Sequence, residues 1–128
     1  MTSSDESFDV IYAYTRAQAI EDGVLINVSP MAREAGFKFP VAITCGLWSE
    51  YITPSKDADL SCQSVEGRLW DTLMVFHAAA RHSDDRIVHF NVSYLMKGRK
   101  MESPQLKGVV GPGDNGEPVI TIMMIDED

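Results

Sequence analysis

The stretch EGRLWDTLMVFHAAARH, residues 66–82, decides the fold because its apolar residues recur at the spacing of a long helix. One row of apolar side chains along that helix consists of Leu69, Leu73, Phe76 and Ala80. A second row beside it consists of Trp70, Met74 and His77. Together the rows form an apolar surface wider than about 100°, which a sheet or several helices must cover. The sequence therefore predicts a long buried helix over residues 67–82.

The segment after this helix alternates between polar and apolar residues, which is typical of β-strands. In RIVHFNVSYLM, residues 86–96, His89, Asn91 and Ser93 share one face while Val88 and Phe90 share the other. QLKGVV (105–110) and VITIMMI (119–125) predict two further strands, with turns at KGRK (97–100) and GPGDNGEP (111–118). Successive strands joined by turns predict an antiparallel meander that covers the helix.

The first half of the chain predicts shorter elements. FDVIYAY (8–14) favours a strand, and RAQAIED (16–22) favours a helix between the cap Thr15 and Gly23. Ser29 and Pro30 mark the start of another short helix. FKFPVAIT (37–44) favours a strand, but Pro40 lacks an N–H donor and belongs at an edge, a bulge or the strand's start.

These elements predict an α+β fold, with an antiparallel or mixed sheet of about four to six strands and the long helix packed on it. A chain of 128 residues fits one domain. We expect this domain over residues 8–125, between a disordered tail (1–7) and an acidic tail (126–128).

Charge and composition narrow the classes of partner. The net charge is −8, and acids near the two ends of the chain account for this excess. The neutral middle lacks the basic face of nucleic-acid proteins, so no direct binding of nucleic acid is expected. The sequence lacks a basic and apolar leader and any apolar run of about 18 residues, which favours a cytoplasmic protein without membrane contact. Cys45 and Cys62 lie in unlike settings, without the CxxC spacing of a metal or redox site.

Several polar residues are candidates for a functional site. The glycine-rich stretch 108–118 lacks the lysine of a phosphate loop, so a structured turn around Asn115 and Gly116 is the favoured interpretation. Arg68 and Asp71 favour a surface pair or a bond to a loop, and His77 favours a buried structural histidine. No ligand spacing for zinc is present, and no cofactor is expected.

The segments YTRAQAIEDGVLINVSPMAREAGFKFPVAIT (14–44), GRLWDTL (67–73) and GPGDNGEPVITIMM (111–124) carry a resemblance that extends from residue 8 onwards. They resemble a family of small bacterial proteins of unknown function found on plasmids, phages and integrative elements. The resemblance implies that the protein belongs to a host that carries mobile DNA. It also implies a role against host defence or in maintenance of the mobile element. It implies no particular reaction.

A second resemblance concerns IYAYTRAQAIEDGVL, residues 11–25. This opening is similar to the start of RNA 2′-phosphotransferase-like ADP-ribosyltransferases, and the resemblance implies an NAD site. Those enzymes place a histidine on the first strand, where this chain has Tyr14. Their late-strand glutamate could be supplied only by Glu117, which lies in a loop.

The first hypothesis is therefore a non-enzymatic acidic binding protein that contacts a host or element protein. Its candidate contact residues are Trp48, Tyr51, Asp114, Glu117, Asp126, Glu127 and Asp128. The alternatives are an ADP-ribosyltransferase-like enzyme and a homo-oligomeric structural domain. The catalytic candidates of the enzyme are Tyr14, Arg16, His89 and Glu117. Convergence of polar side chains in one pocket would favour the enzyme, and an acidic ridge would favour the binding protein.

Overall fold

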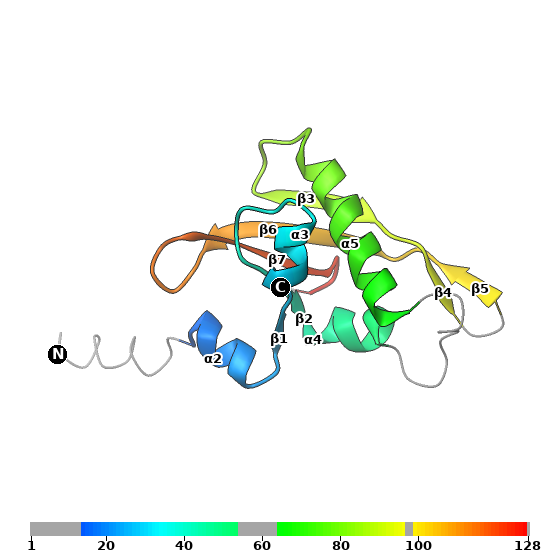
Figure 1. The fold of residues 1–128 in the computed structure, drawn as a ribbon, viewed down its shortest axis with the longest axis horizontal. Coiled ribbons are helices and arrows are strands. Elements are labelled where there is room, and N and C mark those ends of the chain that lie inside the picture. Colours follow the sequence, from blue (N-terminus) through cyan, green and yellow to red (C-terminus); the bar gives the residue numbers. More distant parts are fainter. Residues whose placement is uncertain (1–13, 54–63, 97–98, 128) are drawn as a thin grey trace.

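The protein folds around a five-stranded mixed sheet, seen here in a computed structural model that describes residues 14–53, 64–96 and 99–127 (Figure 1). In spatial order the strands are β1 (Leu25–Asn27), β2 (Val41–Thr44), β7 (Pro118–Met124), β6 (Gln105–Pro112) and β3 (Ile87–Asn91). Strands β2 and β7 are parallel, and all other neighbours are antiparallel. A separate two-stranded sheet pairs β4 (Tyr94–Met96) with β5 (Lys100–Glu102). The predicted α+β class is confirmed.

The long helix α5 (Val65–Ala80) lies across one face of the sheet (Figure 1). It begins two residues earlier than predicted because the hydroxyl of Ser64 caps it and accepts a hydrogen bond from the Gly67 N–H at 3.0 Å. Phe76 packs directly on β6. A Cβ atom added to Gly108 of that strand would lie 2.1 Å from the Phe76 ring, so the absence of a side chain sets how closely helix and sheet approach.

The buried side of α5 differs in part from the prediction. Leu73 and Phe76 are buried as expected, but the second predicted row is wrong, because Trp70 and Met74 are 38% and 40% exposed. The helix instead buries Arg68 and Thr72 completely. Polar side chains are buried where partners satisfy their hydrogen bonds, and these two residues have such partners.

Arg68 connects three elements through its guanidinium group. It donates to the backbone oxygen of Tyr51 at 2.8 Å and to that of Leu95, and lies 5.9 Å from the ring centre of Tyr94. Tyr51 belongs to η1 (Trp48–Ile52), a single π-helical turn that follows the short helix α4 (Cys45–Leu47). The surface position expected for Arg68 is wrong, because its side chain is fully buried and its bonds to Tyr51 and Leu95 go to η1 and β4.

The predicted meander of β3, β6 and β7 is confirmed, but the single strand expected over 86–96 is split. The alternation of burial continues across the break, and Val92 and Tyr94 are buried like Val88 and Phe90. At the break the side-chain amide of Asn91 donates to the backbone oxygens of Ser103 and Pro104, just before β6 begins. The turn expected at 97–100 therefore lies between β4 and β5, and residues 97–98 lie outside the described residues.

The first half of the chain follows its capping signals. Helix α2 (Arg16–Glu21) has a complete capping box, in which Thr15 and Gln18 bond each other's backbone N–H at 3.0 Å. Gly23 has the positive φ, 80°, that a residue ending a helix often requires. The strand expected over 8–14 lies outside the described residues except for Tyr14, which is in no strand.

Two boundaries shift near Pro40. Helix α3 (Ser29–Glu34) includes Ser29 rather than following it, and the Ser29 hydroxyl accepts from the Val41 N–H at 3.1 Å. The strand expected over 37–44 begins only at Val41, directly after Pro40, since proline cannot donate to the sheet. Residues 37–39 are thereby released from the sheet. No helix in the described ranges is long and apolar enough to cross a membrane.

Candidate functional site

Three of the predicted site residues meet where the start of α2 lies against the turn between β6 and β7. The carboxylate of Asp114 accepts hydrogen bonds from the N–H groups of Arg16 at 2.8 Å and Ala17 at 3.0 Å. Glu117 accepts from the Asn115 N–H at 2.9 Å within the same turn. These contacts join residues that are far apart in the sequence.

The Arg16 side chain extends from α2 to the middle of the sheet. Its guanidinium donates to the Thr121 hydroxyl at 2.7 Å and to the Ile120 backbone oxygen at 2.8 Å, both on β7. Burial lowers the pKa of Arg16, while the nearby carboxylates of Asp114 and Glu117 oppose this shift. Arg16, Asp114 and Glu117 line a cavity of about 370 Å³ together with Arg33 of α3.

The other two catalytic candidates do not line this cavity. Tyr14 is 55% exposed, and its hydroxyl donates to the carboxylate of Asp22 at 2.6 Å. That hydrogen bond is the main cause that raises the pKa of Tyr14. His89 lies exposed on β3, paired with Lys107, at the edge of the sheet opposite β1.

The candidate contact residues are largely engaged within the protein. The carboxylate of Glu127 accepts from the Thr44 hydroxyl at 2.8 Å and from the Met124 N–H at 2.9 Å. The hydroxyl of half-buried Tyr51 donates to Glu102 at 3.2 Å, and burial is the main cause that raises its pKa. Trp48 is half-buried against the core, Asp126 is exposed, and Asp128 lies outside the described residues.

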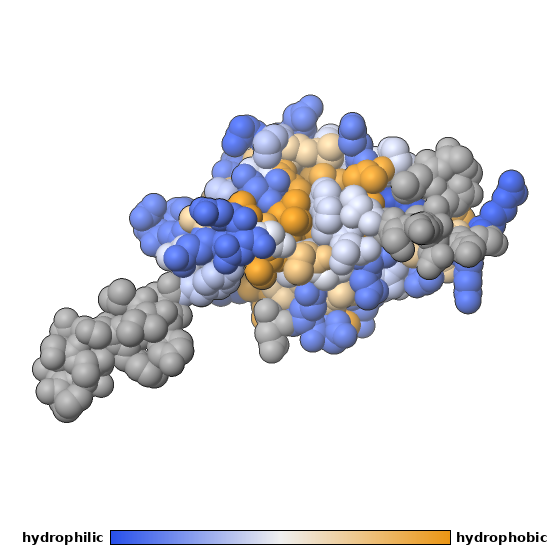
Figure 2. All heavy atoms as spheres, turned by 90° about the horizontal axis from the view of Figure 1, so that it is seen from below, coloured by the Kyte–Doolittle hydropathy of each residue, from blue (hydrophilic) through white to orange (hydrophobic). Residues whose placement is uncertain are grey.

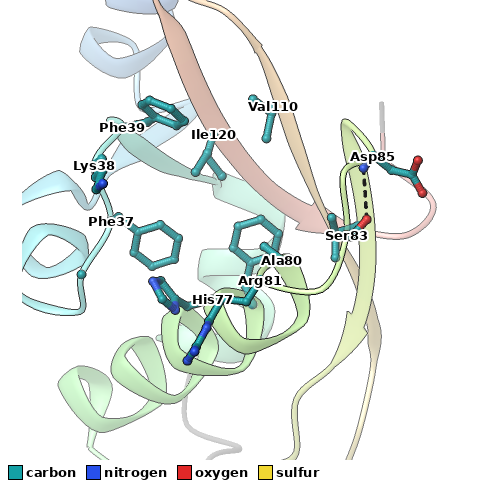
Figure 3. A pocket seen from close by; sticks show the side chains of 13 residues that line it. Phe37, Lys38, Phe39, His77, Ala80, Arg81, Ser83, Asp85, Val110 and Ile120 are labelled. Atoms are coloured by element: carbon teal, nitrogen blue, oxygen red, sulfur yellow. Dashed lines mark hydrogen bonds between the residues drawn. The ribbon is translucent and has the colours of Figure 1, made fainter.

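A second cavity, here called the Phe37 cavity, was not predicted from the sequence. It has a volume of about 330 Å³ and lies between the segment 36–39, the C-terminal end of α5 and the sheet (Figure 3). The apolar side chains that line it include Phe37, Phe39, Phe76, Ala80, Val110 and Ile120. Figure 3 shows that the side chains it labels on the apolar lining gather around one hollow, with Arg81 and Asp85 directed outward at its rim; these are Phe37, Phe39, Ala80, Val110 and Ile120.

Aromatic packing shapes the Phe37 cavity. The rings of Phe37 and Phe76 are parallel, with centres 6.0 Å apart, and the His77 ring stands at 90° to Phe37 at 5.0 Å. His77 is half-buried at this cavity, so the expectation of a buried histidine is only partly confirmed. Phe39 remains 43% exposed. The sequence signal for this site is the pair of phenylalanines in FKFP, a segment that the residue pattern assigns to a strand.

Another side of the molecule carries apolar surface without such a hollow in view. Figure 2 shows apolar atoms in the middle of the side on which α2, β1 and α4 lie, with hydrophilic surface around them. Strand β1 is one edge of the sheet, and edge strands are places where another chain can add. The expectation of a homo-oligomer stays a prediction.

Within the described residues, no group of three or more histidine, cysteine, aspartate or glutamate side chains could hold a metal ion. No curated protein and no solved structure matches the chain. Residues 1–128 match a family described as "Family of unknown function (DUF6573)", and the chain belongs to that family.

Proposed function

We propose that this protein is a non-enzymatic binding protein that acts by contact with another protein, and that the Phe37 cavity is its contact site. The observation that carries the proposal is an open apolar hollow of about 330 Å³ beside the exposed ring of Phe39. Protein interfaces concentrate their binding free energy where large apolar side chains fill such hollows. The partner would supply a side chain that removes this apolar surface from water.

The proposed contact site does not include the acidic residues that the sequence suggested as contact residues. Asp114, Glu117 and Glu127 accept hydrogen bonds from the chain itself, which lowers their availability to a basic partner. The resemblance to proteins of plasmids, phages and integrative elements favours a partner from the host or from the mobile element. A role against host defence or in element maintenance belongs to the same proposal.

Two matched variants, each of which replaces one alanine with phenylalanine, test the site. Ala80→Phe would fill the cavity, whereas Ala78→Phe adds the same ring at an exposed position on the same helix. Each tagged variant is used to capture proteins from host lysate, after circular dichroism shows that it is folded. We expect a partner that is captured by wild type and by Ala78→Phe and lost with Ala80→Phe. Equal capture by both variants, or no specific partner, would contradict the proposal.

A second candidate function is an ADP-ribosyltransferase-like enzyme. It is favoured by the shared cavity of Arg16 and Glu117, although Tyr14 and His89 do not line that cavity. Titration calorimetry with NAD tests it, using Arg16→Lys and Glu117→Gln. Binding of NAD that both substitutions weaken would support the enzyme, and the absence of heat with wild type would contradict it.

A further inference from the structure

We infer that the segment entering the Phe37 cavity is acidic: an extended peptide in which carboxylates flank one aromatic or large aliphatic side chain. This inference deepens the proposed function and rests on it. The net charge of −8 by itself favours a basic partner, whereas this inference predicts an acidic partner segment.

Cationic side chains lie around the cavity. Lys38 and Arg81 line it. An adjoining hollow of about 120 Å³ shares Phe37, Lys38 and Phe39 with it and adds Arg33. A further hollow of about 260 Å³ shares Val110 with it and adds Arg86.

These three hollows collect cations on a protein that is acidic as a whole. Among the described residues that line them, Asp85 is the one acidic side chain, whereas Lys38, Arg81, Arg33 and Arg86 are four cationic side chains. The carboxylate of Asp85 points outward from the cavity (Figure 3). Opposite charges across an interface favour the matching partner and repel others, so the rim selects carboxylates.

The size and grouping of the hollows also favour an extended peptide. The central cavity is near the lower end of the range of about 300 to 1,000 Å³ that small-molecule sites span, so it suits one large side chain. One of the other two hollows shares three lining residues with it and the other shares Val110, so the three hollows are neighbours on the surface. A chain of hollows with one apolar centre fits an extended peptide better than a compact ligand. The centre then supplies apolar contact and the flanks supply charge pairs.

Three fluorescein-labelled synthetic peptides test the chemistry by fluorescence anisotropy. The first has a central tryptophan between aspartates, the second replaces the tryptophan with alanine, and the third replaces the aspartates with lysines. We expect the first to bind wild-type protein about tenfold more tightly than either of the others, since both the apolar centre and the charges contribute. Its affinity should fall as the salt concentration rises, because salt screens exposed charges.

Charge reversal provides the matched variants. Lys38→Glu with Arg81→Glu reverses two exposed cations at the cavity, and Arg99→Glu with Lys100→Glu makes the same charge change at the β4–β5 hairpin. The variant with Lys38→Glu and Arg81→Glu should bind the acidic peptide about tenfold more weakly, because two modest charge pairs are lost. The same variant should bind the lysine peptide more tightly than wild type does. The variant with Arg99→Glu and Lys100→Glu should change the affinity for the acidic peptide and for the lysine peptide by no more than about twofold.

The outcomes separate this inference from the proposed function. If Ala80→Phe abolishes binding of all peptides but charge reversal changes none, the contact site stands and the acidic partner is wrong. If Ala80→Phe changes neither peptide binding nor partner capture, both proposals fail. If the protein alone forms a dimer in sedimentation velocity that Ala80→Phe removes, the occupant is a second copy, and the inference is overturned.

Discussion

Arg68 carries a positive charge inside the protein, and its surroundings explain how the fold tolerates it. The planar guanidinium donates to backbone oxygens of Tyr51 and Leu95 and lies near the Tyr94 ring. The N–H donors of a guanidinium group have a fixed, planar arrangement, so one group can bond two backbone oxygens at once. The single ammonium group of lysine does not reproduce this geometry. Arg68 thus joins α5 to η1 and to the β4–β5 hairpin.

Arg68→Ala should lower the free energy of unfolding by about 2 to 5 kcal/mol, because it removes a fully buried side chain together with its hydrogen bonds to two backbone oxygens. Arg68→Lys should still lose more than about 1 kcal/mol, since it keeps the charge without the fork. Urea unfolding monitored by circular dichroism measures both. A loss below about 1 kcal/mol in Arg68→Ala would show that the guanidinium does not hold these elements together.

Gly108 and Gly111 form a matched pair on β6. An added Cβ at Gly108 would lie 2.1 Å from the Phe76 ring, whereas one at Gly111 meets nothing within 4 Å. Gly108→Ala should therefore cost about 1 to 3 kcal/mol through overpacking. Gly111→Ala should stay within about 0.5 kcal/mol of wild type in the same unfolding experiment. Equal effects would mean that α5 moves freely away from the sheet.

Tyr94 makes stability depend on pH in the alkaline range. Burial raises the pKa of Tyr94 to about 12, above its usual value of about 10. The folded state therefore favours the neutral phenol, and this contribution is complete below pH of about 10 and lost as pH rises to about 12. We expect a fall of about 2 to 3 kcal/mol across this window. Tyr94→Phe should show a smaller fall, and identical pH profiles would contradict the assignment.

At the scale of elements, α2 depends on a carboxylate from the opposite half of the chain. Its own capping box satisfies the N–H of Gln18, while Asp114 satisfies those of Arg16 and Ala17. A negative charge at a helix N-terminus also interacts favourably with the helix dipole. The turn between β6 and β7 therefore fixes α2 against the sheet.

Asp114→Ala should cost about 1 kcal/mol, the usual effect of removing a helix cap. Amide hydrogen exchange should become faster in α2 and remain unchanged in α5, because only α2 loses its partner. Asp84→Ala removes an exposed acid elsewhere and serves as the control. Faster exchange in both helices would show that Asp114 stabilises the whole domain.

The whole molecule is assembled around β7. This strand lies between β2 and β6, so it joins the first half of the chain to the meander formed by the second half. The apolar side chains of Ile120 and Ile122 on β7 belong to the same core as Leu73 and Phe76 of α5. The last strand in the sequence is thus central in space.

Two truncations test this arrangement. Ending the chain before Pro118 removes β7 and should leave it unfolded by circular dichroism and by NMR. Removing only residues 126–128 should leave it folded but less stable by about 1 kcal/mol, because the bonds of Glu127 to Thr44 and Met124 are lost. A folded chain without β7 would show that the first half and α5 form a core by themselves.

Local rules in the sequence were sufficient for the helices and for most strands. The period of Leu69, Leu73 and Phe76 predicted α5, and Thr15 with Gly23 predicted both ends of α2. Alternation predicted which residues of 87–94 are buried, even where the strand is broken. These signals involve neighbours in the chain, so they do not require knowledge of the fold.

The sites depended on contacts that no local rule contains. Arg16 meets Asp114 across 98 positions of sequence, and Phe37 and Phe39 line a cavity because Pro40 delays the start of β2.

The sequence by itself determined the class of the fold, the place of α5, and the meander of β3, β6 and β7. Only the tertiary structure decided that Arg68 and Thr72 are buried while Trp70 and Met74 are exposed. It also decided the parallel pairing of β2 with β7 and the existence of the Phe37 cavity. The physical reason is that periodicity follows from the local backbone. Burial of a polar side chain depends instead on partners that distant segments bring.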